Sequence, residues 1–325
     1  MLRRYVAGLA LVGLLTGCTS TPPLPQDDPS LTSRPEPTGP APSLRQPAEQ
    51  NKPFGILGPV VIAATLGQAP GAATGPEDIT STLLPDGYLR LYFVDRSTRA
   101  VRSALTDRQR QRFVPDPGDR LPAGATAPRL VSRIEGGWRM YYVRDGALVS
   151  AASTDALAFS AEPGTRLTLA QAGVHEPGGY LAGGSVVRLR GDAGYRMYLG
   201  VGHPRDAGDY VRSATSRDGL AWTMESGQRV GPASSDVKES ASRPFAFVNS
   251  DGSVSLYFVA RTPTPAIYVS VGDDGLDFEA KQPTGVPGAL DGVVVPARSG
   301  DQWMYYTTYA PASGGAIEVA TKPED

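Results

Sequence analysis

The chain has 325 residues, with 31 Lys and Arg against 33 Asp and Glu, so its net charge is close to neutral at −2. A balanced chain without a basic cluster lacks the electrostatic footprint of a nucleic-acid-binding protein, and we expect no nucleic acid partner. The single cysteine excludes an internal disulfide, and two histidines are too few for a three-histidine zinc site.

The first 18 residues predict export and lipid attachment. A basic start at Arg3 and Arg4 precedes an uncharged apolar stretch over 5–15, which is too short for a stable membrane span. The segment that follows, Leu15-Thr16-Gly17-Cys18, resembles the lipobox of bacterial lipoproteins. The resemblance implies a signal peptide over 1–17 and an acylated (palmitate-bearing) Cys18 that anchors the protein to the membrane. We expect an extracytoplasmic location in the bacterial cell envelope, at the outer membrane in a Gram-negative cell. The alternative is ordinary signal-peptidase cleavage after Cys18.

Residues 18–53 predict a tether between the lipid and the folded domain. Ten prolines lie between positions 22 and 53 among Ser, Thr, Gln and Asp, with hardly any apolar side chain to bury. Such a composition gives an extended, partly polyproline chain. A proline-rich ligand for another protein is the alternative. The remaining residues, 54–325, are enough for one domain with a substantial core, which we expect to be a monomer.

A repeated strand signature predicts the fold of this domain. Five short aromatic runs contain Tyr92, Tyr141, Tyr198, Tyr257 and Tyr305, and each tyrosine is followed ten to fifteen residues later by a second alternating run. A repeat of this length, with an Asp-containing turn after most second runs, is typical of a propeller blade of four antiparallel strands. The fold class is therefore all-β, a five-bladed β-propeller.

The predicted strands follow the repeat in chain order. Blade 1 is expected at 78–83, 89–94, 101–105 and 112–114, and blade 2 at 128–134, 138–143, 148–153 and 157–161. Blade 3 is expected at 185–189, 195–201, 210–215 and 221–224, and blade 4 at 244–248, 254–260, 267–271 and 277–280. Blade 5 has only 293–297, 303–308 and 316–320. An open edge is unfavourable, so we expect the apolar segment 56–64 to supply the missing strand and close the ring.

The turn motif Ser216-Arg217-Asp218-Gly219-Leu220-Ala221-Trp222 carries a family resemblance. It recurs as 153–159 and, in part, as 274–278, and it resembles the turn of five-bladed glycosidase propellers of the glycoside hydrolase family 43 and arabinanase-like group. Sialidases are the other candidate, but their Asp and Trp lie five residues apart and they use six blades. The motif caps a turn and plugs the gap between blades, so it implies fold more than activity.

Ligands of such propellers bind in the central funnel, where the innermost strands begin. Counting fourteen residues back from the tyrosines gives Asp78, Arg243 and Asp291 in blades 1, 4 and 5, and Arg129 lies close to the equivalent point of blade 2. With His175 and Tyr180, we expect Arg129, Arg243 and Asp291 to bind the hydroxyl groups of a sugar. Alternatively, Asp78 and Asp291 only orient inner strands, and Arg243 neutralises Asp291.

The resemblance also implies a catalytic pattern that is only partly present. Family 43 hydrolysis needs a base on blade 1, a helper carboxylate on blade 2 and an acid on blade 3. Asp78 is the candidate base, whereas blade 2 offers Arg129 and blade 3 offers Gly183 and Gly184. Glu176 and Glu239, in loops, are the candidate acids.

The sequence leaves three functions open. The first is a surface-anchored glycosidase-like propeller that binds or hydrolyses a carbohydrate. The second is a non-catalytic propeller that binds a glycan or peptide, and the third is a scaffold for envelope assembly. We expect no metal and no cofactor. A structural calcium ion at an acidic turn such as 273–274 stays open, although such turns more often satisfy their own backbone amides.

Overall fold

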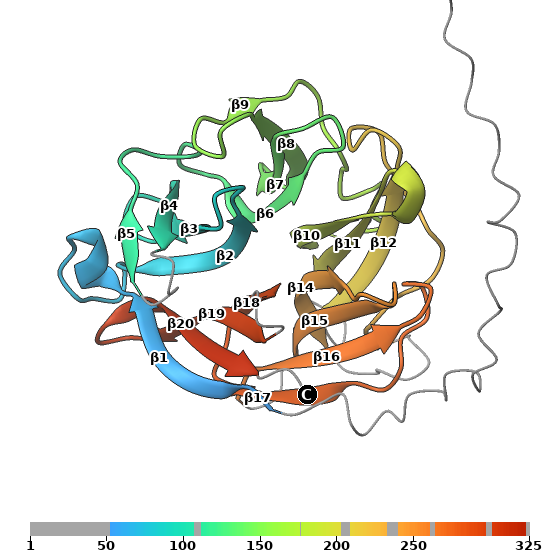
Figure 1. The fold of residues 1–325 in the computed structure, drawn as a ribbon. Helices are drawn as coiled ribbons and strands as arrows, with labels where there is room; N and C mark the ends of the chain where they lie inside the picture. The colour runs from blue at the N-terminus through green and yellow to red at the C-terminus, as the bar shows by residue number, and fades with distance from the viewer. Residues whose placement is uncertain are drawn as a thin grey trace, which may run out of the picture. The chain divides into compact units, whose positions relative to one another are not determined.

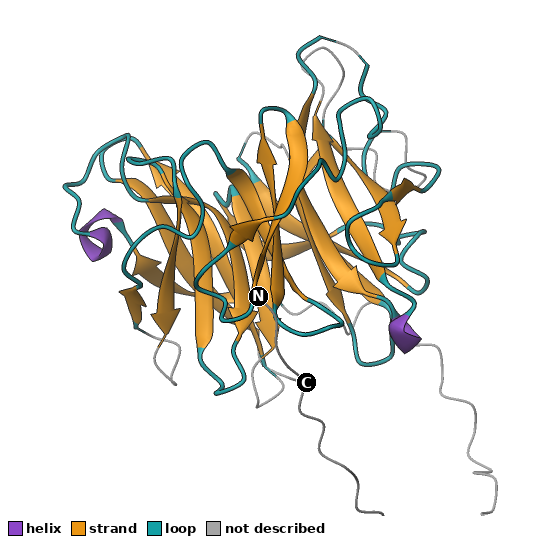
Figure 2. Cartoon of the chain, turned by 90° about the horizontal axis from the view of Figure 1, so that it is seen from above, coloured by secondary structure: helices purple, strands orange, loops and turns teal. Residues whose placement is uncertain are grey.

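The computed structural model of the chain forms five antiparallel sheets arranged as blades around one axis (Figure 1). The structure describes residues 53–106, 112–175, 177–202, 209–232, 240–260, 264–296 and 301–322. Each sheet contains four strands, which confirms the predicted all-β, five-bladed propeller. Within these ranges the helices are two 3-10 turns, η2 (Ala63–Leu66) and η3 (Arg190–Asp192), seen in Figure 2. No helix of the described residues could cross a membrane.

In blades 1 to 4 the strands run outward from the axis in chain order, and in blade 5 the first strand of the chain lies outermost. Blade 1 contains β2 (Pro76–Leu83), β3 (Leu89–Asp95), β4 (Val101–Thr106) and β5 (Phe113–Pro115), and blade 2 contains β6 (Thr126–Ser132), β7 (Trp138–Arg144), β8 (Ala147–Ser153) and β9 (Ser160–Ala161). Blade 3 contains β10 (Tyr180–Arg188), β11 (Tyr195–Gly202), β12 (Tyr210–Ser216) and β13 (Thr223–Met224). Blade 4 contains β14 (Ala241–Val248), β15 (Val254–Ala260), β16 (Ala266–Gly272) and β17 (Gln282–Pro287). Blade 5 contains β18 (Asp291–Pro296), β19 (Gln302–Ala310), β20 (Gly314–Lys322) and, outermost, β1 (Gly55–Val61).

The ring closes as the sequence predicts, through the N-terminal strand. β1 pairs antiparallel with β20, with Gly55 opposite Thr321 and Val61 opposite Ile317. The strand ends at Val61, before the predicted end at residue 64, because the chain turns into η2, which is capped at its C-terminal end by Gly67 in the left-handed conformation (φ 71°). The backbone N–H of Phe54 also donates to the carbonyl of Thr284 on β17, at 2.8 Å, so the closing segment contacts blade 4 as well.

The core is divided into five apolar clusters, one between each pair of neighbouring blades. For example, Val131 and Tyr141 of blade 2 pack with Val186 and Met197 of blade 3. The five tyrosines of the repeat lie on the second strands and are buried, with at most 6% of any of them exposed. The recurring aromatic therefore fills the space between blades, which explains why it is repeated once per blade.

The outermost strand of blade 4 lies further along the chain than expected. The sequence predicted it at 277–280, whereas β17 begins at Gln282. Asp274 accepts hydrogen bonds from the N–H groups of Leu276 and Asp277, at 2.8 and 3.0 Å, which holds this segment in a turn. Phe278 then packs edge-on against Tyr198 of blade 3, with ring centroids 5.9 Å apart. The turn thus keeps its predicted plugging role, and the strand follows it.

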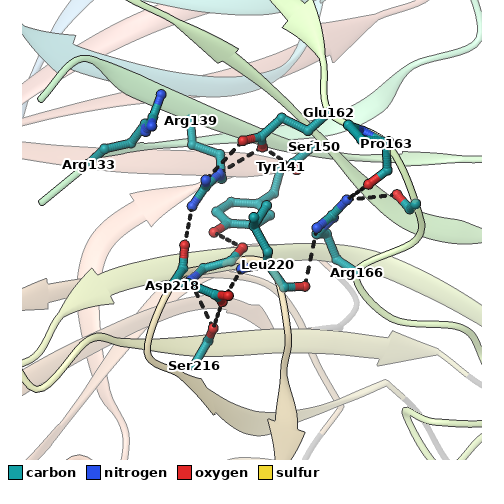
Figure 3. A network of polar contacts seen from close by, with 12 residues as sticks. Arg133, Arg139, Tyr141, Ser150, Glu162, Pro163, Arg166, Ser216, Asp218 and Leu220 are labelled. Atoms are coloured by element: carbon teal, nitrogen blue, oxygen red, sulfur yellow. Dashed lines mark hydrogen bonds and ion pairs between the residues drawn. The ribbon is translucent and has the colours of Figure 1, made fainter. Parts of the chain in front are cut away.

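Neighbouring blades are joined by a polar clamp that begins at the repeat tyrosine, shown for blades 2 and 3 in Figure 3. The hydroxyl of Tyr141 donates to the carbonyl of Gly219, at 2.8 Å, in the Asp turn of blade 3. Arg139, buried beside it, donates to the carbonyl of Asp218 at 2.7 Å and holds Glu162 of its own blade through two bonds of 2.7 and 2.9 Å. Bidentate pairs of this kind fix geometry as well as adding energy.

The same clamp recurs at two further joints. Tyr92 donates to the carbonyl of Ala156 at 2.7 Å between blades 1 and 2, and Tyr198 donates to that of Gly275 at 2.9 Å between blades 3 and 4. The other two joints are built differently. The Tyr257 hydroxyl lies 3.4 Å from the side-chain oxygen of Gln302, and the ring of Tyr305 packs edge-on against Phe113 of blade 1 with centroids 5.6 Å apart.

Candidate functional site

The inner strands of blades 1 to 4 each begin with a bulge. The register with the second strand shifts there, and the residue at the shift has positive φ: 45° at Asp78, 48° at Ala127, 90° at Gly183 and 54° at Arg243. This conformation costs a residue other than glycine about 1–2 kcal/mol. Six such residues occur in the described ranges, and three of them lie at these bulges. Strained residues gathered at the starts of the inner strands are typical of a functional site.

The bulges bring Asp78 and Arg243 together across the ring, whereas Asp291, which has the same offset from its tyrosine, pairs with Arg129. The guanidinium Nη1 of Arg243 donates to Oδ1 of Asp78, and the backbone N–H of Ala127 donates to Oδ2 at 2.8 Å. The Asp78 side chain is 10% exposed and that of Arg243 is 32% exposed. The pair therefore presents the remaining guanidinium donors and carboxylate lone pairs on an accessible surface.

A second ion pair occupies the centre of the ring. Arg129 donates to Oδ1 of Asp291 at 2.7 Å, and its other donors reach the carbonyls of Ile79 at 2.8 Å and Pro244 at 3.4 Å. One side chain of blade 2 thus contacts blades 1, 4 and 5. Both members of the pair are buried, with side chains 2% and 1% exposed. Each of these two charges has a partner, which is what burial of ionised groups requires.

A pocket of about 110 Å³ lies beside the Asp78–Arg243 pair. Its polar lining residues, from blades 1 to 4, are Asp78, Thr126, Tyr180, Asp209, Ser242 and Arg243. Ala127, Leu181 and Ala182 add apolar walls. Carboxylates, a guanidinium, a phenol and hydroxyls in one small space form a set of donors and acceptors suited to a ligand rich in hydroxyl groups.

One wall of the pocket is a tyrosine bonded to a buried carboxylate. The hydroxyl of Tyr180, at the start of β10, donates to Oδ1 of Asp209 at 2.6 Å. Tyr180 is 36% exposed and Asp209 only 2%. The backbone of Asp209 is tied to the start of blade 4, because its carbonyl accepts from the N–H of Ala241 at 2.7 Å and its N–H donates to Oγ of Ser240 at 2.9 Å.

The predicted site residues fall into four groups. Asp78, Arg243 and Tyr180 line the pocket. Arg129 and Asp291 form the buried central pair instead, so they stabilise the ring and do not line the pocket, and Arg129 takes the partner role toward Asp291 that the sequence suggested for Arg243. His175 is exposed and is not among the lining residues. The candidate acids Glu176 and Glu239, and Cys18, lie outside the described residues.

Among the charged side chains that line the pocket, Asp209 is the one that sequence reasoning missed. The predicted site contained only the starts of inner strands and the loops that lead into them, whereas Asp209 immediately precedes β12, the third strand of blade 3. Its position eleven residues after Tyr198 matches no equivalent carboxylate in the other blades, so the repeat carries no signal for it.

No cluster of acidic, histidine or cysteine side chains that could hold a metal ion occurs in the ranges that the structure describes. The acidic turn considered for calcium uses the Asp274 carboxylate to accept two of its own backbone N–H groups. These hydrogen bonds, from Leu276 and Asp277, also lower the pKa of the Asp274 carboxyl below its ordinary value.

No protein-family model and no curated protein sequence matches this chain. Solved structures with the same fold do. A glycosyl hydrolase from Bacteroides ovatus matches with a TM-score of 0.57 at 15% identity, over 86% of this chain and 96% of the other. An endo-arabinase from Bacteroides thetaiotaomicron matches with a TM-score of 0.57 at 14% identity, over 84% and 98%. An α-L-arabinofuranosidase from Clostridium thermocellum matches with a TM-score of 0.56 at 14% identity, over 74% and 88%. Identities this low show a shared fold.

Proposed function

We propose that this chain is a carbohydrate-binding propeller of the glycosidase-like type, whose pocket holds one sugar residue. The observation that carries the proposal is the Asp78–Arg243 pair, held at two strained bulges and open to the pocket. The similar structures named as a glycosyl hydrolase, an arabinofuranosidase and an endo-arabinase support a carbohydrate ligand. A cavity of about 110 Å³ is smaller than the roughly 300–1,000 Å³ of sites for drug-sized ligands, so it suits the end of a glycan chain.

Hydrolysis of the bound glycan is the second candidate function. Asp78 and Asp209 both line the pocket, and glycosidases use two carboxyl groups that flank the scissile bond. Asp78 would be the base, as the family resemblance implies, and Asp209 would join Glu176 and Glu239 as a candidate acid. Non-catalytic ligand binding and an envelope scaffold are the alternatives.

A glycan array and a panel of aryl-glycosides test both functions on the full-length protein. The blocking variant is Ala182→Leu, which fills the pocket without removing a polar group. The second variant is Asp78→Asn, which removes a charge-assisted hydrogen bond. The matched control is Glu135→Gln in the exposed turn at the opposite end of the β6–β7 hairpin, where Glu135 is 50% exposed.

We expect wild type and the control to bind the same glycans, Asp78→Asn to bind about 10- to 100-fold more weakly, and Ala182→Leu not to bind. Turnover of an aryl-glycoside that disappears in Asp78→Asn would add hydrolysis to the function. Binding that survives in Ala182→Leu with the fold intact would place the ligand elsewhere and refute the proposal.

We also propose that Cys18 anchors the protein in the bacterial cell envelope. The lipobox resemblance and the proline-rich tether support this. A Cys18→Ser variant is expected to move from the membrane fraction to the soluble fraction and to lose labelling by a palmitate analogue. Unchanged fractionation would argue against lipid anchoring.

A further inference from the structure

The ring of Tyr180 lies flat over a glycine of the neighbouring strand. A Cβ built on Gly202 would be 2.0 Å from Cζ of Tyr180 and 2.4 Å from both Cε1 and Cε2. Equal distances to the two Cε atoms, with Cζ nearest, mean that Gly202 faces the ring plane at its hydroxyl end. Tyr180 and Gly202 are also direct partners in the β10–β11 pairing. Only a residue without a Cβ leaves room for the ring in this position.

The hydroxyl end of the ring is fixed by Asp209 on the next strand. From β10 the side chain crosses β11 at Gly202 and donates to Asp209, beside β12, at 2.6 Å. Asp209 is itself buried and bonded through its backbone to blade 4. The contact with Gly202 therefore fixes the tilt of the Tyr180 ring, and the hydrogen bond to Asp209 fixes the position of its hydroxyl end. The face of the ring turned away from the sheet thus has a fixed orientation.

We propose that Tyr180 is the aromatic wall of the pocket, against which the C–H face of a pyranose ring packs, and that Gly202 and Asp209 are the positioning residues that hold it. The inference rests on the proposed carbohydrate-binding function. Tyr180 is 36% exposed, whereas Leu181, the other large apolar residue of the lining, is only 6% exposed, so Tyr180 offers the broad accessible apolar surface of the pocket. Aromatic side chains supply such surface in ligand sites at low entropic cost.

The test uses the full-length protein and methyl glycosides of D-galactose, D-mannose, D-xylose and L-rhamnose, with NMR titration. A proton above an aromatic face shifts upfield, so the readout is the shift of the sugar C–H signals as well as the affinity. The variants are Tyr180→Phe, Tyr180→Ala and Gly202→Ala. Gly71→Ala is the matched control, because a Cβ there meets only Thr74, at 3.9 Å, and no positive φ is involved. Thermal unfolding verifies that each variant is folded.

We expect Tyr180→Ala and Gly202→Ala each to abolish the upfield shift and to weaken binding about 5- to 10-fold. Tyr180→Phe keeps the ring, and we expect it to keep a reduced shift. The double variant Gly202→Ala with Tyr180→Ala should bind no more weakly than Tyr180→Ala alone, because Gly202 acts only through the ring.

The outcomes separate this inference from the function on which it rests. If methyl glycosides bind wild type and are blocked by Ala182→Leu, but no upfield shift occurs or Tyr180→Ala binds normally, the aromatic wall is wrong and the binding function stands. A normal shift in Gly202→Ala would refute the positioning role of Gly202. If no glycoside binds wild type better than Ala182→Leu, the binding function fails and the inference fails with it.

Discussion

Removal of a single hydroxyl from two equivalent blade joints should destabilise the protein unequally. In Tyr198→Phe the buried carbonyl of Gly275 loses its only hydrogen-bond donor in the described part of the chain. In Tyr141→Phe the equivalent carbonyl of Gly219 keeps a second donor, because the indole N–H of Trp222 also reaches it, at 3.1 Å. The two substitutions delete the same atom, so the difference between them isolates the cost of an unsatisfied acceptor.

The expected free-energy losses follow from that difference. A net hydrogen bond contributes about 1 kcal/mol, which we expect for Tyr141→Phe. A buried acceptor left without a donor costs about 1–3 kcal/mol, so we expect about 2 kcal/mol for Tyr198→Phe. For a domain of this size each kcal/mol lowers Tm by about 2–4 °C. Tyr309→Phe, on a side chain that is 38% exposed, is the control and should change stability by less than about 0.5 kcal/mol.

Urea unfolding of the three variants measures these differences. The slope of free energy against urea should be unchanged, since no variant alters the surface exposed on unfolding. A loss in Tyr141→Phe equal to or greater than the loss in Tyr198→Phe would refute the reasoning, because it would show that the second donor does not compensate. Adding Trp222→Phe to Tyr141→Phe should bring the total loss to at least that of Tyr198→Phe.

Four further outcomes are expected. Burial raises the pKa of Tyr198 to about 12 from 10.0, so its contribution is fully present below pH 10 and falls by about 2 kcal/mol as pH rises to 12; alkaline unfolding of wild type and Tyr198→Phe measures this loss. Hydrogen bonds from two N–H groups of its own turn lower the pKa of Asp155 to about 2 from 3.8, so its contribution is present above pH 3.8 and lost as pH falls to 2, and Asp155→Asn should show a weaker acid dependence in circular dichroism titrations. Asp291→Asn leaves the buried Arg129 without its counter-charge and should lower stability by about 3–5 kcal/mol in urea, whereas a loss under about 1 kcal/mol would contradict the buried pair. Gly183→Ala places a Cβ 3.0 Å from that of Ala127 at a φ of 90° and should cost about 2 kcal/mol by calorimetry.

The fold could be predicted because one physical requirement repeats in every blade. Each gap between blades needs an aromatic plug, so the tyrosines recur and their spacing counts the blades. The offset from these tyrosines also located Asp78 and Arg243, since equivalent points on inner strands converge on the axis. Positions that are equivalent in several blades can therefore be located from the sequence.

The pairing of the charges could not be predicted in the same way. At a bulge, one extra residue reverses which face a side chain points to, and the sequence does not show on which side of Arg129 or Arg243 the bulge ends. In the structure Asp291 pairs with Arg129, and Asp78 pairs with Arg243. Asp209 belongs to no repeated position, so only the folded blade brings it to the pocket.

The pairing of β1 with β20 sets the order in which the protein can be completed. Residue 55 leaves the ribosome long before its partner, residue 321, exists, so the first strand of the domain is the last to find its place. Until then β1 stays unpaired and blade 5 lacks its outer strands, and long-range pairing of this kind is slow and exposed to aggregation. A chain that ended before Gly314 would retain blades 1 to 4 and the pocket residues, but its ring could not close. The ring can therefore close only after nearly the whole domain has been synthesised.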